Sequence, residues 1–465
     1  MNSSEKLGQA WQHHQAGQFH RAEHLYQQVL SSEPEHPDAL HMLGILAHQT
    51  GHSEPGIELV KRALRNRPDD ARIHANLAMM LEASGRLERA IEHNRKALAL
   101  MPEHTGAWLN LANQLRATGE IDEAIASYRA LLSQNPDDVA GWSNLGSALR
   151  SNGELDQAIE AFERALTLSP DSADVHSNLG NALQEADRHD DAIKAFRKAI
   201  ALRPDFADAH ANLGIAHLQT GRTDEAISAL DACLQLEPAN RTALAMKTIA
   251  LCEADNAEAA QALTDLDVGI RETVVDSARG FESSASFNRA LAEHACNHPS
   301  IRYEPFSKTT RRGRQTGNLL EGTRGPVARL EQIINDAVRA YLDDMPFPPD
   351  HPYRGRQVKN WSLNVWATVL DDQGHQAPHI HPGGWLSGVY YVSLPKGMHD
   401  NDNAGAIEFG CVPDGFTLAT PPRTRLLTPK EGSLLVFPSF FYHRTLPFKS
   451  GQPRISIAFD AIPVE

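Results

Sequence analysis

The first 240 positions of the chain place apolar and small side chains in a pattern that repeats every 34 residues. In the clearest copy, Val139 to Ser172, two apolar stripes at helical spacing are separated by a glycine and closed by a proline. The closing prolines are Pro34, Pro68, Pro102, Pro136, Pro170, Pro204 and Pro238. An unbroken series at one spacing predicts seven copies of one unit, each made of two antiparallel helices.

Small residues in each copy indicate how its two helices pack. Gly146 and Ala158 allow the two helices to approach each other closely, and Phe162 fills the space beside these small residues. Pro170 ends the second helix, because proline cannot continue it. An eighth copy, from Arg241 to about Leu266, is degenerate and lacks the final proline. We expect this last pair to cap the stack.

The order of leucine-glycine, glycine, alanine, aromatic residue, alanine and proline resembles the tetratricopeptide repeat. The resemblance implies an all-α superhelix of about seven repeats and a capping pair over residues 1–270. Such solenoids offer a concave groove for an extended peptide or a partner protein. The competing interpretation is a spacer or a dimerisation surface with no ligand of its own.

An asparagine recurs at the same place in five consecutive copies. These residues are Asn76, Asn110, Asn144, Asn178 and Asn212. Residues one repeat apart would form a ladder on one face, and their amides can clamp a peptide backbone without reading its side chains. Helix–helix packing that favours asparagine at this position is an equal interpretation.

From about Asp267 the repeating pattern is lost. A short helical segment lies within residues 285–300. The basic stretch from Lys308 to Gly317 is expected as an exposed hairpin loop, with attraction of an acidic substrate as the other interpretation. Pro326 to Leu342 carries one apolar stripe, which predicts an amphipathic helix packed against a sheet.

After Pro352 short apolar or alternating runs predict strands. They cover Asn360–Leu370, Leu386–Leu394, Ala406–Gly410, Arg425–Leu427, Ser433–Pro438 and Arg454–Ile462. Turn residues separate them, among them Asp371 to Gly374. Short strands in such a succession favour a β-sandwich or jelly roll. We therefore predict a β domain with flanking helices at 285–465, joined to the repeats by a linker at 271–284.

Composition narrows the classes of function. The chain has 465 residues and a formal net charge of −15, which argues against nucleic-acid binding through a general basic surface. The sequence shows neither a targeting signal nor an apolar run of membrane-spanning length, so no membrane association is expected. The four cysteines (Cys233, Cys252, Cys296 and Cys411) are scattered, which favours a reducing, cytoplasmic location.

Candidate chemistry lies near the C-terminal end. His379 and His381 precede a predicted strand, and His443 follows a later one. Imidazole nitrogens suit Fe(II), and a three-cornered site leaves positions open for oxygen and a cosubstrate. Arg454 and Ser456 come next, and they offer a planar fork and a hydroxyl suited to holding a carboxylate.

The motifs from His379 to Ser456 resemble those of the 2-oxoglutarate/Fe(II)-dependent oxygenases, a double-stranded β-helix (jelly-roll) superfamily that includes the prolyl hydroxylases, and the resemblance covers roughly residues 285–465. The resemblance implies Fe(II) and 2-oxoglutarate as cofactors, O2 as the oxidant and ascorbate as a supporting reductant. It also implies that His379 and His443 bind the metal. Arg454, Ser456 and Tyr391 would hold the far carboxylate of oxoglutarate.

The sequence departs from that family at one ligand. The family has an aspartate or glutamate two residues after the first histidine, and this chain has His381. In our preferred interpretation His381 is the third ligand, with Glu408 or a water molecule as the alternatives. Asn364, Trp366 and Trp385 are candidate walls of the site, although ordinary core packing is the favoured interpretation for each of them taken singly.

These features predict a dioxygenase that hydroxylates a protein or peptide recruited by the repeats. The first rival is a scaffold whose oxygenase-like domain has lost activity, and the missing carboxylate is the reason to consider it. The second rival is an oxygenase for a small molecule, with the repeats serving assembly.

Overall fold

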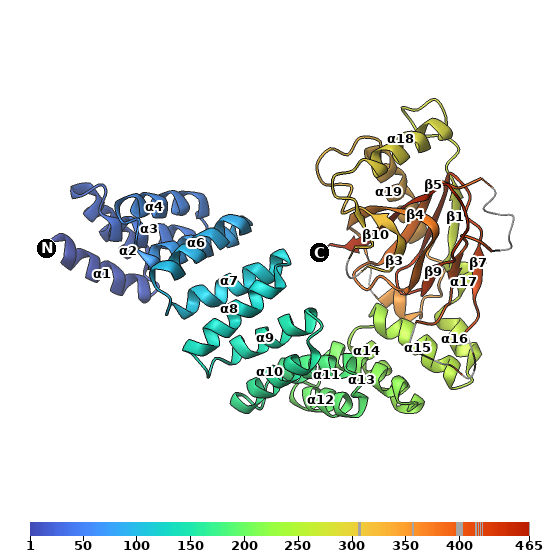
Figure 1. Ribbon diagram of the computed structural model, residues 1–465, viewed down its shortest axis with the longest axis horizontal. Helices are drawn as coiled ribbons and strands as arrows, with labels where there is room; N and C mark the ends of the chain where they lie inside the picture. The colour runs from blue at the N-terminus through green and yellow to red at the C-terminus, as the bar shows by residue number, and fades with distance from the viewer. Residues whose placement is uncertain are drawn as a thin grey trace. The chain divides into compact units, whose positions relative to one another are not determined.

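A computed structural model describes residues 1–305, 308–355, 358–396, 403–413, 416, 418, 420 and 422–464. The chain divides into two compact units, Met1–Leu202 and Arg203–Glu465. The first unit is built of helices, and the second joins further helices to an antiparallel sheet (Figure 1). The predicted fold class, tetratricopeptide helices followed by a curled sheet of the jelly-roll kind, is confirmed.

The first unit is a stack of helical hairpins. Its helices are α1 Ser3–Gln15, α2 Phe19–Ser32, α3 Pro37–Gln49, α4 Ser53–Asn66, α5 Ala71–Ala83, α6 Leu87–Leu100, α7 Thr105–Thr118, α8 Ile121–Gln134, α9 Val139–Ser151, α10 Leu155–Leu168, α11 Ala173–Glu185 and α12 His189–Leu202. A Cβ atom on Gly146 of α9 would lie only 2.8 Å from the ring of Phe162 on α10. The aromatic residue therefore requires the glycine, because a packed interior leaves no room for both side chains.

One position in this stack departs from apolar packing. Asn94 on α6 stands where Phe162 stands two repeats later, is fully buried, and donates a hydrogen bond to Gln114 at 2.9 Å. Gln114 donates in turn to Glu82 at 2.8 Å. The Oδ1 atom of Asn94 has no partner among the described residues. A buried polar atom without a hydrogen bond lowers stability, so this is a weak point of the repeat stack.

The second unit opens with five helices that continue the repeat sequence. They are α13 Ala207–Gln219, α14 Thr223–Leu236, α15 Arg241–Glu253, α16 Ala257–Leu263 and α17 Leu266–Gly269. Seven regular hairpins and a shorter eighth pair are therefore present within residues 1–270, all of which the structure describes. The apolar core of α13–α17 is continuous with that of the sheet, since one buried cluster runs from Ala207 to Ala461.

The sheet is antiparallel throughout the described residues, in the order β1-β8-β5-β10-β4-β9-β6-β7, with β2 and β3 attached beside β4. Its strands are β1 Arg271–Val274, β2 Arg302–Tyr303, β3 Thr310–Gln315, β4 Trp361–His379, β5 Leu386–Ser393, β6 Ile407–Phe409, β7 Arg425–Leu427, β8 Ser433–Pro438, β9 His443–Thr445 and β10 Arg454–Pro463. The segment 271–284, expected as a linker, begins with β1, which pairs with β8.

Two helices accompany the sheet, as the sequence predicted for 285–300 and 326–342. They are α18 Ser284–Cys296 and α19 Val327–Asp343 (Figure 1). The Tyr390 hydroxyl of β5 donates to Asn288 of α18 at 2.6 Å, and Trp361 of β4 donates to Asn335 of α19 at 2.8 Å. These bonds fix both helices against the strands that carry the candidate site.

Strand β4 is longer than predicted and pairs with a different strand along each of its two halves. Its first half pairs with β10 and its last residues pair with β9. The expected turn at 371–374 lies inside this strand, where Gln373 adopts a left-handed φ of 59°. The turn residues therefore bend a continuous strand, because backbone pairing on both sides of the bend holds it extended.

The basic stretch expected as an exposed loop is also a strand, β3. It pairs with β4, and Arg311 and Arg312 are exposed while Thr310 and Gly313 are buried. The exposed arginines lie on the solvent face of a paired strand. The number of basic residues alone does not show that the segment is paired.

Candidate metal centre

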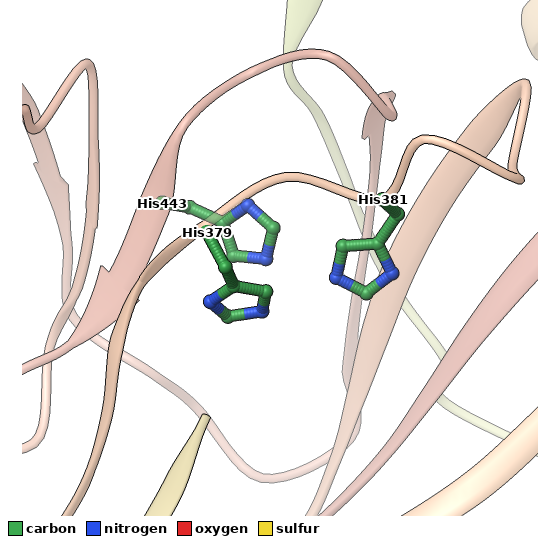
Figure 2. Close-up of side chains that lie close together, drawn as sticks. All are labelled: His379, His381 and His443. Carbon is green, nitrogen blue, oxygen red and sulfur yellow. The ribbon is translucent and has the colours of Figure 1, made fainter. Parts of the chain in front are cut away.

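Three histidines come together where β4 ends. His379 is the last residue of β4 and is the register partner of His443, the first residue of β9. His381 follows in the next loop. One ring nitrogen from each histidine lies within 4.8 Å of the others, and Figure 2 shows the three rings facing a common space. This separation allows a single metal ion to be bound by all three.

Each imidazole is held through its Nδ1 atom. In His379 and His443 this atom lies 2.7 and 2.9 Å from the backbone carbonyl two residues earlier in the chain. A carbonyl only accepts hydrogen bonds, so Nδ1 carries the proton and Nε2 keeps a free electron pair. In His381 the Nδ1 atom lies 2.7 Å from a carboxylate oxygen of Asp460. The Nε2 atoms are therefore the ones available for a metal.

Asp460 places a carboxylate directly behind the histidine that replaces the family's acidic ligand. Its side chain is 13 % exposed and also accepts a hydrogen bond from Ser387 at 2.6 Å. The buried Nε2 atom of His381 has no partner among the described residues. A carboxylate on the far nitrogen of an imidazole fixes its orientation and raises its basicity toward a metal. Sequence reasoning missed Asp460, although an acidic residue inside the apolar run of β10 was the available signal.

Burial keeps two of the histidines neutral. Desolvation, reinforced by the neighbouring His381, lowers the pKa of His379 from 6.5 to about 4. Burial and the two adjacent imidazoles lower the pKa of His443 well below its ordinary value. Neither ring needs to lose a proton at neutral pH before it can bind a metal.

Aromatic rings surround the histidines. The centroid of His443 lies 4.9 Å from that of Phe437, and Trp366 stacks on His381 at 5.6 Å. Trp366 thus forms a wall of the site. Trp385 is 1 % exposed and stacks on Tyr353 at 4.1 Å, so it belongs to the packed core.

A second polar cluster lies inside the sheet at the start of β10. Ser456 is the register partner of both Thr368 on β4 and Tyr391 on β5. The guanidinium carbon of Arg454 lies 5.1 Å from the ring centroid of Tyr391, and all four side chains are buried. The sheet register thus brings the predicted clamp residues together.

Several polar atoms of this cluster lack partners. Nε and Nη1 of Arg454 and the hydroxyl of Thr368 make no hydrogen bond to a described residue. Burial lowers the pKa of Arg454, since the charged form loses its water, and raises that of Tyr391. A buried cation with unused donors is expensive unless an anion neutralises it. The cluster therefore suits a small carboxylate.

A pocket of about 480 Å³ opens beside His379 and His381. Its lining is mostly polar and comprises Lys308, Thr309, Gln315, Thr316, Gly317, Asn318, Asn364, Trp366, Gln376, His379, Ile380, His381, Pro382, Gly383 and Asp460. Asn364, a predicted wall residue, is among them. The pocket is large enough for one substrate side chain and the backbone on either side of it.

The remaining predicted residues lie elsewhere. Glu408 forms an ion pair with Arg444 at 2.5 Å and lies outside the histidine cluster. The asparagines of the ladder are half-buried on α5, α7, α9, α11 and α13. Asn76 donates to His41 at 2.9 Å, and Asn144 to Asn113 at 3.4 Å, in each case across to the preceding repeat.

Family models match both parts of the chain. One described as "Putative 2OG-Fe(II) oxygenase" matches residues 364–460. Tetratricopeptide-repeat models match residues 13–80, 109–173 and 177–241. The oxygenase match covers the three histidines, Asp460 and the Arg454 cluster. Within the described part of the chain, no helix combines the length and apolar character needed to cross a membrane.

Solved structures resemble parts of the chain. The MamA protein is 28 % identical, with a TM-score of 0.35, over 36 % of this chain and 91 % of its own. YrrB, titled a TPR protein with an unusual peptide-binding site, is 23 % identical, with a TM-score of 0.37, over 40 % and 95 %. The C-terminal part of a TPR repeat-containing protein from Cytophaga hutchinsonii is 15 % identical, with a TM-score of 0.45, over 52 % and 98 %. No curated protein matches the chain.

Proposed function

We propose that this chain, which carries tetratricopeptide repeats and a C-terminal 2OG-Fe(II) oxygenase domain, is a dioxygenase that hydroxylates a protein or peptide with Fe(II) and 2-oxoglutarate. The observation that carries the proposal is the pairing of two sites within one sheet. Three histidines face a common space, and a buried arginine whose Nε and Nη1 atoms make no hydrogen bond to a described residue lies at the start of β10. A metal ion would bind the histidines, and one carboxylate of a dicarboxylate would pair with the arginine.

The metal site follows from the histidines. His379, His381 and His443 would hold Fe(II) through their Nε2 atoms. With O2 as the oxidant, bound Fe(II) and 2-oxoglutarate would supply the chemistry that converts a substrate C–H bond to C–OH: one oxygen atom of O2 enters the substrate and the other enters succinate, as oxoglutarate loses carbon dioxide. Three neutral imidazoles do not compensate the positive charge of the ion. The Asp460 carboxylate, which contacts His381, would supply part of that compensation.

The oxoglutarate site follows from the buried arginine. Arg454 would bind the far carboxylate with its fork, and the hydroxyls of Tyr391, Ser456 and Thr368 would donate the remaining hydrogen bonds. Such a ligand satisfies polar atoms that otherwise stay unpaired inside the sheet. Phe437 beside His443 keeps that side of the metal site dry.

The substrate side of the site is polar. The amides of Asn364 and Gln376 line the pocket beside the histidines and can hydrogen-bond a peptide backbone. Recruitment of that peptide is assigned to the repeat groove, with Asn110 and Asn178 as clamp residues. The contacts of Asn76 and Asn144 to the preceding repeats give these two residues a packing role as well.

The test is an anaerobic titration of the metal-free protein with Fe(II) and 2-oxoglutarate, followed through the visible charge-transfer band of a chelated oxoacid. The parent should develop the band, His443→Ala should lose it, and Arg454→Ala should weaken it. His375→Ala is the matched control, because this histidine lies on the same strand and outside the cluster. A parent that shows no band would exclude the enzyme and leave the scaffold interpretation.

A further inference from the structure

The loop that carries His381 is fastened to the last pair of repeat helices. Arg241, the first residue of α15, donates from Nε and Nη2 to the backbone carbonyl of Pro382 at 2.8 and 2.6 Å. Both residues belong to the second compact unit. One arginine fork therefore holds the peptide that follows a candidate metal ligand.

The other ties of this loop are one turn bond, in which the amide of Gly384 donates to the carbonyl of His381 at 3.1 Å, and bonds to the sheet. The amide of His381 donates to Ser439 at 2.9 Å, and that of Trp385 donates to Ala461 at 2.8 Å. Between them, Pro382 has no amide hydrogen to donate, and Gly383 has open space where a side chain would be. Glycine adds conformational freedom at the same place. Arg241 thus provides the described side-chain tie at the centre of this turn, in addition to the bond between Gly384 and His381.

Pro382 also separates two hollows. It lines the pocket beside the histidines, and it lines a second hollow of about 560 Å³ formed by the start of α15 and the turn before it. Arg241 itself is part of the second hollow. A shift of Pro382 would therefore change the shape of the substrate pocket as well as the direction in which His381 points.

We propose that Arg241 is a positioning residue of the metal centre, through which the last repeat pair keeps the Nε2 atom of His381 turned toward the other two histidines. The proposal rests on the metal site of the proposed function. Helix α15 would then help to position a metal ligand, in addition to capping the repeat stack. It also gives the terminal repeats a direct mechanical connection to the site.

The experiment compares four full-length proteins: the parent, Arg241→Ala, Arg241→Lys and Arg425→Ala. The control is matched, because Nη1 of Arg425 on β7 donates to the backbone carbonyl of Leu266 on α17 at 2.6 Å. This bond is also an arginine-to-carbonyl tie between the sheet and the helices that precede it. Two quantities are measured without oxoglutarate: Co(II) affinity from its visible absorption, and amide hydrogen exchange of residues 381–385.

Arg241→Ala should lower Co(II) affinity about tenfold or more, as loss of an outer-shell group does in metal sites, and should speed exchange in the loop. Arg241→Lys should have a Co(II) affinity and an exchange rate between those of the parent and Arg241→Ala, since the lysine ammonium can still donate one hydrogen bond. Arg425→Ala should match the parent in both, whatever it does to thermal stability.

Two results would overturn the proposal. Equal losses in Arg241→Ala and Arg425→Ala would show general destabilisation, and unchanged affinity and exchange in Arg241→Ala would show that the tie does not position the loop. Neither readout requires oxoglutarate or turnover. A failed oxoglutarate titration would therefore count against the oxygenase proposal and leave this result interpretable.

Discussion

His379 and His443 are register partners on the antiparallel strands β4 and β9, and their ring centroids lie 4.3 Å apart. Backbone pairing fixes these two imidazoles, so their separation does not depend on a loop. His381 lies beyond the strand and is oriented by Asp460 and by the loop around Pro382. The third position of the cluster is accordingly the one most sensitive to substitutions outside the cluster.

Asp460→Asn tests the charge behind His381. The asparagine keeps the size of the side chain and an acceptor oxygen but removes the negative charge. We expect the affinity for Co(II) or Fe(II) to fall about 10- to 100-fold. Competition against a chelator of known affinity measures it.

The control for this substitution is Asp371→Asn, which removes an acid on β4 that pairs with Arg314 away from the cluster. This variant should bind metal as the parent does. Equal affinities for Asp460→Asn and the parent would show that hydrogen bonding alone, without charge, orients His381.

Arg454→Met should separate stability from ligand binding. Methionine fills a similar volume and removes a buried charge that forms no ion pair with a described residue, so the ligand-free protein should be at least as stable as the parent. Oxoglutarate should no longer raise the melting temperature of the metal-loaded variant. Calorimetry with and without oxoglutarate measures both effects, and a large loss of stability without ligand would contradict the account.

Acidification should destabilise the metal-free protein through His379. Its pKa is about 4 in the folded chain against an ordinary 6.5, so the unfolded chain takes up the proton first as the pH falls. The stability present above pH 6.5 is therefore lost between about 6.5 and 4, by on the order of 1 to 2 kcal/mol at pH 5.

Urea unfolding at pH 7 and pH 5 measures this loss in the parent and in His379→Asn. The variant removes the titrating group and should lose less stability over the same interval. Identical losses in the two proteins would show that His379 does not contribute, and that other buried histidines carry the acid sensitivity.

The repeats were predictable because their information is local. A proline series at one spacing and the pairing of Gly146 with Phe162 determine each hairpin and its neighbour contacts. The same regularity makes departures visible, and Asn94 is one of them. Its partner Gln114 could not be inferred, because that contact depends on how adjacent hairpins stack.

The site was predictable in part. His379, His443 and Arg454 stand at recognisable distances along the chain, but the orientation of His381 depends on Asp460 and Arg241, which are remote in sequence. Residues 371–374 predict a turn but bend a paired strand, because turn residues look alike whether a chain reverses or a paired strand curves. The orientation of His381 and the course of β4 both depend on contacts between residues that are far apart in the sequence.

Removing the buried polar pair of the third and fourth repeats should stabilise the first unit. Asn94→Leu with Gln114→Met replaces both partners of one hydrogen bond and the unpaired Oδ1 atom by apolar side chains. We expect the melting temperature of the repeats to rise by about 2 to 8 °C. Asn94→Ala alone should lower it, since the Oε1 atom of Gln114 loses its donor and a cavity is left, and a double variant no more stable than that would contradict the prediction.

Strand β1 has a consequence for the order in which the chain folds during synthesis. Arg271 on β1 pairs with Val436 on β8, so the edge of the sheet waits for a strand that is synthesised much later than β1. The hairpins of α1–α12 contact sequence neighbours and can close as they leave the ribosome. In the nascent chain the hairpins of the first unit would thus be folded while the sheet is still open, and this interval is when aggregation or chaperone capture competes with folding.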